Sequence, residues 1–201
     1  MLQITDLTYR IGGRVILDRV SLTIPDGHKV GLIGRNGAGK STLMKVIAGV
    51  EQLTTGEIAV DGERVHFADT RAAAAHGIGI VFQELNLFPN MTVADNIFIT
   101  REKTRGGVDI DGRSQHSEAA SLMKRLEHDI SPDVLVGELS IGEQQIVEIA
   151  KALARDARIL IMDEPTSALS AAEVEILFRV IKDLKKAGVG IIYISHRLEE
   201  L

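Results

Sequence analysis

The chain has 201 residues and contains no cysteine, no tryptophan and few aromatic residues, 3% in all. Without cysteine, disulfides, thiolate metal sites and a catalytic thiol are excluded. Positive charge is also in deficit: the formal net charge is −5, so no overall basic surface predicts nucleic acid as a partner. No apolar run approaches the ~20 residues that a membrane-spanning helix needs, and the first residues turn polar too soon for a secretory signal. We therefore expect any membrane role to go through a partner protein.

What the chain does contain is the balance of an ordinary globular domain. Hydrophobic residues make up 45% and charged residues 25%, which is typical of a folded domain with a sizeable core. The chain shows no internal repeat and no low-complexity linker. We expect a single domain over residues 1–201.

The most informative segment is a glycine-rich loop at residues 34–41, which reads Gly-Arg-Asn-Gly-Ala-Gly-Lys-Ser and fits the phosphate-loop pattern G-x-x-x-x-G-K-[ST]. A predicted buried strand (29–33) precedes it and a predicted helix (41–48) follows it, which is the context that the motif requires. Its glycines let backbone N–H groups turn toward phosphate oxygens, and the helix N-terminus adds partial positive charge. Lys40 can reach the β- and γ-phosphates, and the Ser41 hydroxyl can ligate Mg²⁺. The alternative is an ordinary glycine-rich turn. The residues expected to contact nucleotide are Gly34, Arg35, Asn36, Gly37, Ala38, Gly39, Lys40, Ser41 and Thr42.

The rest of the pattern predicts alternating strands and helices. Two runs, 159–162 and 191–194, are continuously apolar, as strands buried on both faces of a parallel sheet are. Segment 100–114 is the least regular and is expected to be an exposed loop inside a mostly helical stretch at about 92–155. Further strands are expected at 2–9, 15–24 and 78–82, a hairpin at 57–65 about Asp61-Gly62, and helices at 68–76 and around 119–126, 146–153 and 174–184.

Two carboxylates, Asp163 and Glu164, follow the predicted strand 159–162 directly. The carboxyl end of a parallel strand is where ligands bind in α/β proteins. The first carboxylate can hold Mg²⁺ beside the Ser41 hydroxyl, and the second can orient or deprotonate an attacking water. A solvated acidic pair at a strand end is the alternative. Downstream of a phosphate loop, the pair favours nucleotide hydrolysis.

Four more segments follow the phosphate loop in an order that is itself informative. Gln83 follows the predicted strand 78–82, and residues 139–145 read Leu-Ser-Ile-Gly-Glu-Gln-Gln at the start of a predicted helix. Residues 167–170 read Ser-Ala-Leu-Ser, and His196 follows the strand 191–194. Together with the phosphate loop, these segments resemble the Q-loop, signature motif, D-loop and switch histidine of ATP-binding-cassette (ABC) ATPases.

Within that family, residues 83–87 and 148–153 look like those of bacterial sugar importers of the ribose, galactose and xylose type. Those proteins carry two cassettes on one chain, and this chain resembles the N-terminal one. The chain ends just past the switch histidine, where the family continues with further strands and a helix. We therefore expect the chain to be truncated there.

The resemblance implies a role for each matched position. Gln83 would touch Mg²⁺ and water while its loop senses a permease, and His196 would contact the γ-phosphate and the attacking water. Ser140 and the backbone of Gly142 would contact the γ-phosphate of a nucleotide on a second cassette, paired head to tail. The expected catalytic residues are thus Glu164, His196 and Gln83, the expected metal ligands are Ser41, Gln83 and Asp163, and the cofactors are ATP and Mg²⁺.

Two motifs depart from the family pattern. The aromatic residue that stacks on adenine would be Tyr9, although Ile11 lies nearer the glycines that follow, so either side chain could lie under the base. The signature has Ile141 where glycine is usual and Glu143 where glutamine is usual. A carboxylate aimed near a γ-phosphate is electrostatically unfavourable, so we expect the site completed by this signature to be the weaker of two.

The sequence thus predicts an α/β phosphate-loop nucleoside triphosphatase with a mostly parallel core sheet, an N-terminal antiparallel β layer and a helical subdomain inserted at about 92–155. The expected function is ATP hydrolysis that drives import of a small solute, expected to be a sugar, through a membrane permease. The expected partners are a second cassette, the permease and, indirectly, a solute-binding protein, with the chain peripheral on the cytoplasmic face of the inner or plasma membrane. The alternatives are a cassette ATPase acting on nucleic acid or the ribosome, and a regulator that binds nucleotide without hydrolysing it.

Overall fold

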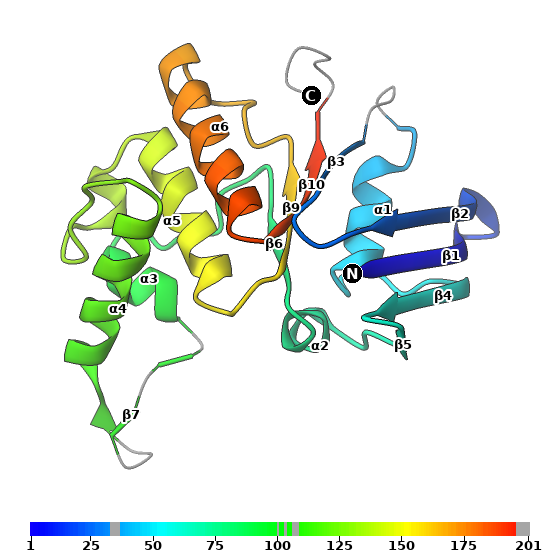
Figure 1. The fold of residues 1–201 in the computed structure, drawn as a ribbon, viewed down its shortest axis with the longest axis horizontal. Helices are drawn as coiled ribbons and strands as arrows, with labels where there is room; N and C mark the ends of the chain where they lie inside the picture. Colours follow the sequence, from blue (N-terminus) through cyan, green and yellow to red (C-terminus); the bar gives the residue numbers. More distant parts are fainter. Residues whose placement is uncertain (33–36, 100, 103, 106–108, 196–201) are drawn as a thin grey trace. The chain divides into compact units, whose positions relative to one another are not determined.

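A computed structural model describes residues 1–32, 37–99, 101–102, 104–105 and 109–195. The chain divides into two compact units, and Figure 1 gives the elements of each. The first unit comprises residues 1–80, 157–165 and 184–201, and the second comprises residues 81–156 and 166–183. Among the described residues, no helix is both long enough and apolar enough to cross a membrane.

The first unit begins with an antiparallel sheet in the order β2-β1-β4-β5. Buried side chains of three of its strands belong to the core of this unit, as expected for a sheet with one face on a core, and bulges interrupt the alternation of buried and exposed side chains in β1. The turn between the last two strands lies at Asp61-Gly62, as the sequence predicts. The strands are β1 (Leu2–Ile11), β2 (Arg14–Ile24), β4 (Thr55–Val60) and β5 (Glu63–Val65).

A second sheet of the same unit has the order β3-β10-β9-β6. Its central strand β10 (Gly190–Ile194) pairs in parallel with β3 (Lys29–Leu32) and with β9 (Ile159–Asp163); β6 is Ile78–Val81. The side chains of the two middle strands are almost fully buried up to the last residue of β9. These parallel strands and the antiparallel layer confirm the predicted α/β class.

Helix α1 (Lys40–Ile47), labelled in Figure 1, packs its apolar face into the core of this unit. That core joins residues of α1 with residues of both sheets. Leu43, Met44 and Ile47 lie at the i, i+1 and i+4 spacing that places them on one side of a helix. The short helix α2 (Thr70–Ala75) begins after Asp69, whose side chain accepts the Ala72 N–H at 2.8 Å.

The second unit is mostly helical. Helix α3 (Val93–Phe98), α4 (Gly112–Arg125) and α5 (Ile141–Leu153) contact one another pairwise (Figure 1). A 3₁₀ turn, Val136–Glu138, precedes α5, and a two-residue ladder joins β7 (Thr104–Arg105) to β8 (Asp109–Ile110). Helix α6 (Ala171–Lys186) lies mostly in this unit.

The predicted loop at 100–114 is wrong at its C-terminal end. Gly112–Ser114 already belong to α4, because the Asp111 side chain accepts the Ser114 N–H at 3.2 Å and caps the helix. An aspartate at this position satisfies an N–H that the first helical turn leaves without a backbone partner. The helices expected around 119–126, 146–153 and 174–184 are confirmed as parts of α4, α5 and α6.

Candidate functional site

The described part of the phosphate loop ends at the N-terminus of α1. Gly39 has a left-handed backbone, φ +84°, and an added Cβ would lie 2.8 Å from Leu17 Cδ2 and 3.2 Å from the Ile16 carbonyl oxygen. Only glycine fits there without strain. No side chain in the described ranges caps α1, and the N–H groups of a helix's first turn are the groups that bind an anion at sites of this kind. Gly34, Arg35 and Asn36 lie outside the described residues; Gly37, Ala38, Lys40, Ser41 and Thr42 lie where the motif predicts.

Ser41 and Asp163 come together although 122 positions separate them. The Ser41 hydroxyl donates to Asp163 Oδ1 at 3.2 Å. Asp163 is the last residue of β9. Burial raises the pKa of its carboxyl, and the charge of Glu164 adds to this, while the Ser41 hydrogen bond and the nearby Lys45 and Lys40 oppose it. A hydroxyl and a carboxylate at one point are oxygen ligands of the kind that Mg²⁺ prefers.

Glu164 has an unusual backbone for a residue with a side chain, φ +46°. Its N–H donates to the carbonyl oxygen of Ile194 at 3.1 Å, which holds the residue at the end of the neighbouring strand β10. A non-glycine residue in this conformation costs of the order of 1–3 kcal/mol and occurs often at functional sites. Five other non-glycine residues of the described ranges also have a positive φ, so the role of Glu164 stays a prediction based on its position after β9.

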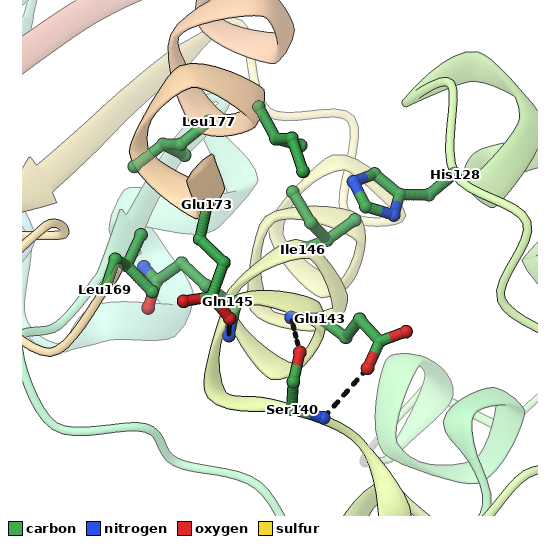
Figure 2. A pocket seen from close by; sticks show the side chains of 10 residues that line it. His128, Ser140, Glu143, Gln145, Ile146, Leu169, Glu173 and Leu177 are labelled. Atoms are coloured by element: carbon green, nitrogen blue, oxygen red, sulfur yellow. Dashed lines mark hydrogen bonds between the residues drawn. The ribbon is translucent and has the colours of Figure 1, made fainter. Parts of the chain in front are cut away.

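In the second unit, Ser140 and Glu143 form a capping box at the start of α5 (Figure 2). The Ser140 hydroxyl oxygen accepts the Glu143 N–H at 3.2 Å, and Glu143 Oε2 accepts the Ser140 N–H at 2.8 Å. This arrangement satisfies N–H groups that the helix end would leave open. The carboxylate expected to disturb a phosphate is therefore held by its own helix terminus.

Gly142 is buried, and its N–H donates to Glu173 Oε1 at 3.0 Å. The sequence did not point to Glu173. A signal was present, because Ser170 and Glu173 repeat the S-x-x-E spacing of Ser140 and Glu143, which is the sequence signature of a capped helix start.

Gln83 is exposed and lies just after β6. Three residues on, the backbone of Asn86 is held at both of its polar groups. Glu148 Oε1 accepts the Asn86 N–H at 2.8 Å, and Lys151 Nζ donates to the Asn86 carbonyl oxygen at 2.8 Å. Burial raises the pKa of Glu148 and lowers the pKa of Lys151. Both side chains extend from α5, so this helix carries the signature motif at one end and fixes the segment after Gln83 further along.

The two candidates for contact with adenine differ in exposure. Tyr9 is only 6% exposed, and its hydroxyl donates to Glu51 Oε2 at 2.8 Å, whereas Ile11 is 57% exposed. Ile11 therefore offers the larger apolar surface, and the assignment of the adenine contact stays a prediction. His196 lies outside the described residues. The structure thus brings together Ser41, Asp163 and Glu164 in the first unit, and Ser140 and Gly142 in the second.

A glycine-rich loop at a helix N-terminus, with a carboxylate at the end of a parallel strand facing the helix's first serine, defines a phosphate-loop nucleotide-binding protein. The model of the ABC transporter family matches residues 17–167. The chain belongs to this family.

Two relatives of known name are similar over nearly the whole chain. The ribose import ATP-binding protein of Rhodopirellula baltica is 55% identical over 92% of this chain and 36% of its own length. A Burkholderia cenocepacia protein named for ribose, galactose and methyl galactoside import is 50% identical over 100% of this chain and 40% of its own. The chain therefore spans well under half the length of each.

Solved structures of ABC cassettes have the same fold. The ADP conformation of one transporter cassette superimposes with a TM-score of 0.87 at 26% identity, covering 99% of this chain and 82% of that one. A dimeric cassette in a post-hydrolysis state with ADP and Pi gives a TM-score of 0.81 at 28% identity, covering 100% and 90%.

Proposed function

We propose that this chain is an ATP-binding and ATP-hydrolysing domain that powers import of a small sugar through a membrane permease. The observation that carries the proposal is the 3.2 Å contact between Ser41 and Asp163, which places two Mg²⁺-type ligands at the phosphate-loop helix. The names of the two relatives support a sugar of the ribose or galactose type as the solute.

Each residue has a chemical role in this proposal. The N–H groups around Gly37–Gly39 and the ammonium of Lys40 bind the phosphates, and Ser41, Asp163 and Gln83 hold Mg²⁺. When bound, the ion neutralises charge that develops on the phosphate oxygens. Glu164 orients or deprotonates the attacking water at the end of β9. His196 contacts the γ-phosphate, and Tyr9 or Ile11 lies under the adenine.

The proposed partners follow from the signature motif. Ser140 and Gly142 are proposed to meet the γ-phosphate of ATP on a second cassette in a head-to-tail pair, and the dimeric cassette structure supports the pairing of two cassettes. A permease and, indirectly, a solute-binding protein complete the system, with the chain peripheral on the cytoplasmic face of the membrane. The net charge of −5 favours this reading over one in which the chain acts on nucleic acid.

A calorimetric titration with Mg-ATP tests the nucleotide site. Lys40→Ala removes a charge-assisted contact of about 1.5–3 kcal/mol, so we expect affinity to fall roughly tenfold to hundredfold. Lys182→Ala is the matched control, because Lys182 is an exposed lysine on α6, in the unit that does not hold the phosphate loop. Equal affinity in the wild type and Lys40→Ala would contradict the proposal. Phosphate release by the wild type then tests hydrolysis.

A further inference from the structure

One carboxylate, that of Glu173, binds the N-termini of two helices. Its Oε1 accepts the Gly142 N–H of α5 at 3.0 Å. Its Oε2 accepts the Ser170 N–H at 2.8 Å and the Ser170 hydroxyl at 2.7 Å, just before α6. These hydrogen bonds, those from Ser170 first, lower the pKa of Glu173. An ionised carboxylate therefore lies on the backbone donor that the proposed function assigns to a γ-phosphate.

A cavity of about 270 Å³ lies beside this carboxylate (Figure 2). Ile146, Leu169, Ile176 and Leu177 give it an apolar wall, and both Glu173 and Gln145 line it. The volume far exceeds the ~30 Å³ share of one water. The space is therefore large enough for a side chain on its wall to change position.

Gln145 has a donor to offer in this cavity. Its side chain is 4% exposed, and its Nε2 has no hydrogen-bond partner among the residues that the structure describes. A buried amide N–H without a partner costs free energy, so it favours any conformation that brings an acceptor to it. Glu173 is one of the acceptor-bearing residues that line the cavity with Gln145, and Figure 2 labels the two side chains next to each other.

We propose that Glu173 has two positions: it occupies the Gly142 N–H while no anion is there, and moves to the Gln145 amide when a phosphate arrives. The inference rests on the proposed function only for the identity of the arriving anion. A γ-phosphate and a carboxylate cannot share one N–H, and their charges repel. The terminal torsion of a glutamate is broad, so the carboxylate can rotate toward Gln145, and this rotation also moves Oε2 relative to Ser170. Glu173 exchanges the hydrogen bond from Gly142 for one from Gln145, and Gly142 keeps an acceptor in the phosphate, so the exchange leaves neither N–H without a partner. Glu173 thus acts as a positioning residue that keeps the signature donor covered until nucleotide displaces it.

The move can be tested in the 201-residue chain without a second cassette. A Cβ on Gly142 would lie 2.5 Å from Glu173 Oε1, so Gly142→Ala displaces the carboxylate by itself. We expect the Gln145 side-chain amide resonances in a ¹H–¹⁵N spectrum to move downfield in Gly142→Ala. They should return in Gly142→Ala/Glu173→Ala. If the Gln145 amide resonances do not move in Gly142→Ala, or move equally in both variants, the proposal that Glu173 has two positions is refuted.

The competition is tested by ATP-dependent association of the chain in sedimentation velocity, in a Glu164→Gln background that retains ATP. Glu173→Gln removes the charge but keeps the capping geometry, because glutamine also serves at this position. The neutral amide that replaces the Glu173 carboxylate competes less well with the phosphate for the Gly142 N–H, so association should become about tenfold tighter. That factor corresponds to the difference between a charge-assisted and a neutral hydrogen bond. Glu175→Gln, an exposed glutamate on the same helix, is the matched control and should not change it.

Gln145→Leu should weaken association about tenfold when Glu173 is present and leave it unchanged in Glu173→Gln. Equal effects of Gln145→Leu in both backgrounds, or a weaker association of Glu173→Gln than of the Glu164→Gln background, would overturn the inference. A complete lack of ATP-dependent association would refute the proposed pairing instead, and the resonance experiment would still decide the movement of Glu173.

Discussion

Gly39→Ala tests whether the tight approach of the phosphate loop to β2 is needed for both folding and nucleotide binding. The residue has φ +84°, and its new Cβ would lie 2.8 Å from Leu17 Cδ2 and 3.2 Å from the Ile16 carbonyl oxygen. A left-handed conformation costs a residue with a side chain about 1–2 kcal/mol. Overpacking against β2 adds about 1–3 kcal/mol. The free energy of unfolding should therefore fall by about 2–5 kcal/mol, a large part of a typical stability.

The chain offers a matched control in Gly62. It has the same φ of +84°, but an added Cβ would meet nothing within 4 Å. Gly62→Ala should thus show the backbone cost alone, about 1–2 kcal/mol. At about 2–4 °C per kcal/mol for a chain of this size, calorimetric melting temperatures should separate the two variants by roughly 2–12 °C.

The loop has one other way to relieve the contact, which is to shift away from β2. The cost would then appear as weaker Mg-ATP binding by Gly39→Ala, with less loss of stability, so both quantities are measured on both variants. The reasoning is refuted if Gly39→Ala and Gly62→Ala lose equal stability and bind Mg-ATP equally.

Three further predictions follow from the site. Glu164→Gln should lower phosphate release about 10²–10⁴-fold with ATP binding retained, whereas Asp163→Asn should weaken Mg-ATP binding as well; near-wild-type turnover of Glu164→Gln would remove it from the reaction. Glu143→Ala should lower the free energy of unfolding in urea by about 1 kcal/mol because the capping box is lost, and Glu143→Gln should lower it less; equal losses would contradict this. Burial raises the pKa of Glu148 above the ordinary glutamate value of 4.5, so the folded state binds more protons and stability falls as pH rises from about 4.5 through the folded pKa. Glu148→Gln should flatten that fall between pH 4.5 and 7, and an unchanged difference in unfolding free energy between these two pH values would refute the assignment.

Much of the fold could be predicted because its strongest signals are local. The continuous apolar runs at 159–162 and 191–194 indicated buried parallel strands, and the Asp61-Gly62 pair indicated a hairpin. The start of α4 was missed because its cap, Asp111, lies in a segment whose glycines and charges resemble a loop. The order β3-β10-β9-β6 was not predicted, because strand order depends on long-range pairing that no local pattern encodes.

The candidate site likewise has some parts that the sequence predicts and others that depend on long-range contacts. The phosphate loop and the acidic pair are sequence motifs with a fixed spacing, and the structure brings Ser41 to Asp163 as the motifs predict. The S-x-x-E spacing of Ser140 and Glu143 also indicates a capping box, which the charge of Glu143 alone does not reveal, and the weaker site that this charge predicts stays a prediction. The contacts of Glu173 with Gly142 and of Glu148 with Asn86 span 31 and 62 positions. Neither leaves a periodic signal, so both required coordinates.

The double attachment of Asn86 to α5 has a mechanical consequence. Glu148 and Lys151 lie three residues apart and bind the N–H and the C=O of the same residue, so the segment cannot slide along the helix or rotate over it while both bonds hold. Eight residues separate Ser140 from Glu148, about 12 Å along the helix axis. A displacement of the segment after Gln83 therefore either breaks these two hydrogen bonds or moves α5 with it. Because α5 begins at the signature motif, a movement of the whole helix would also move Ser140.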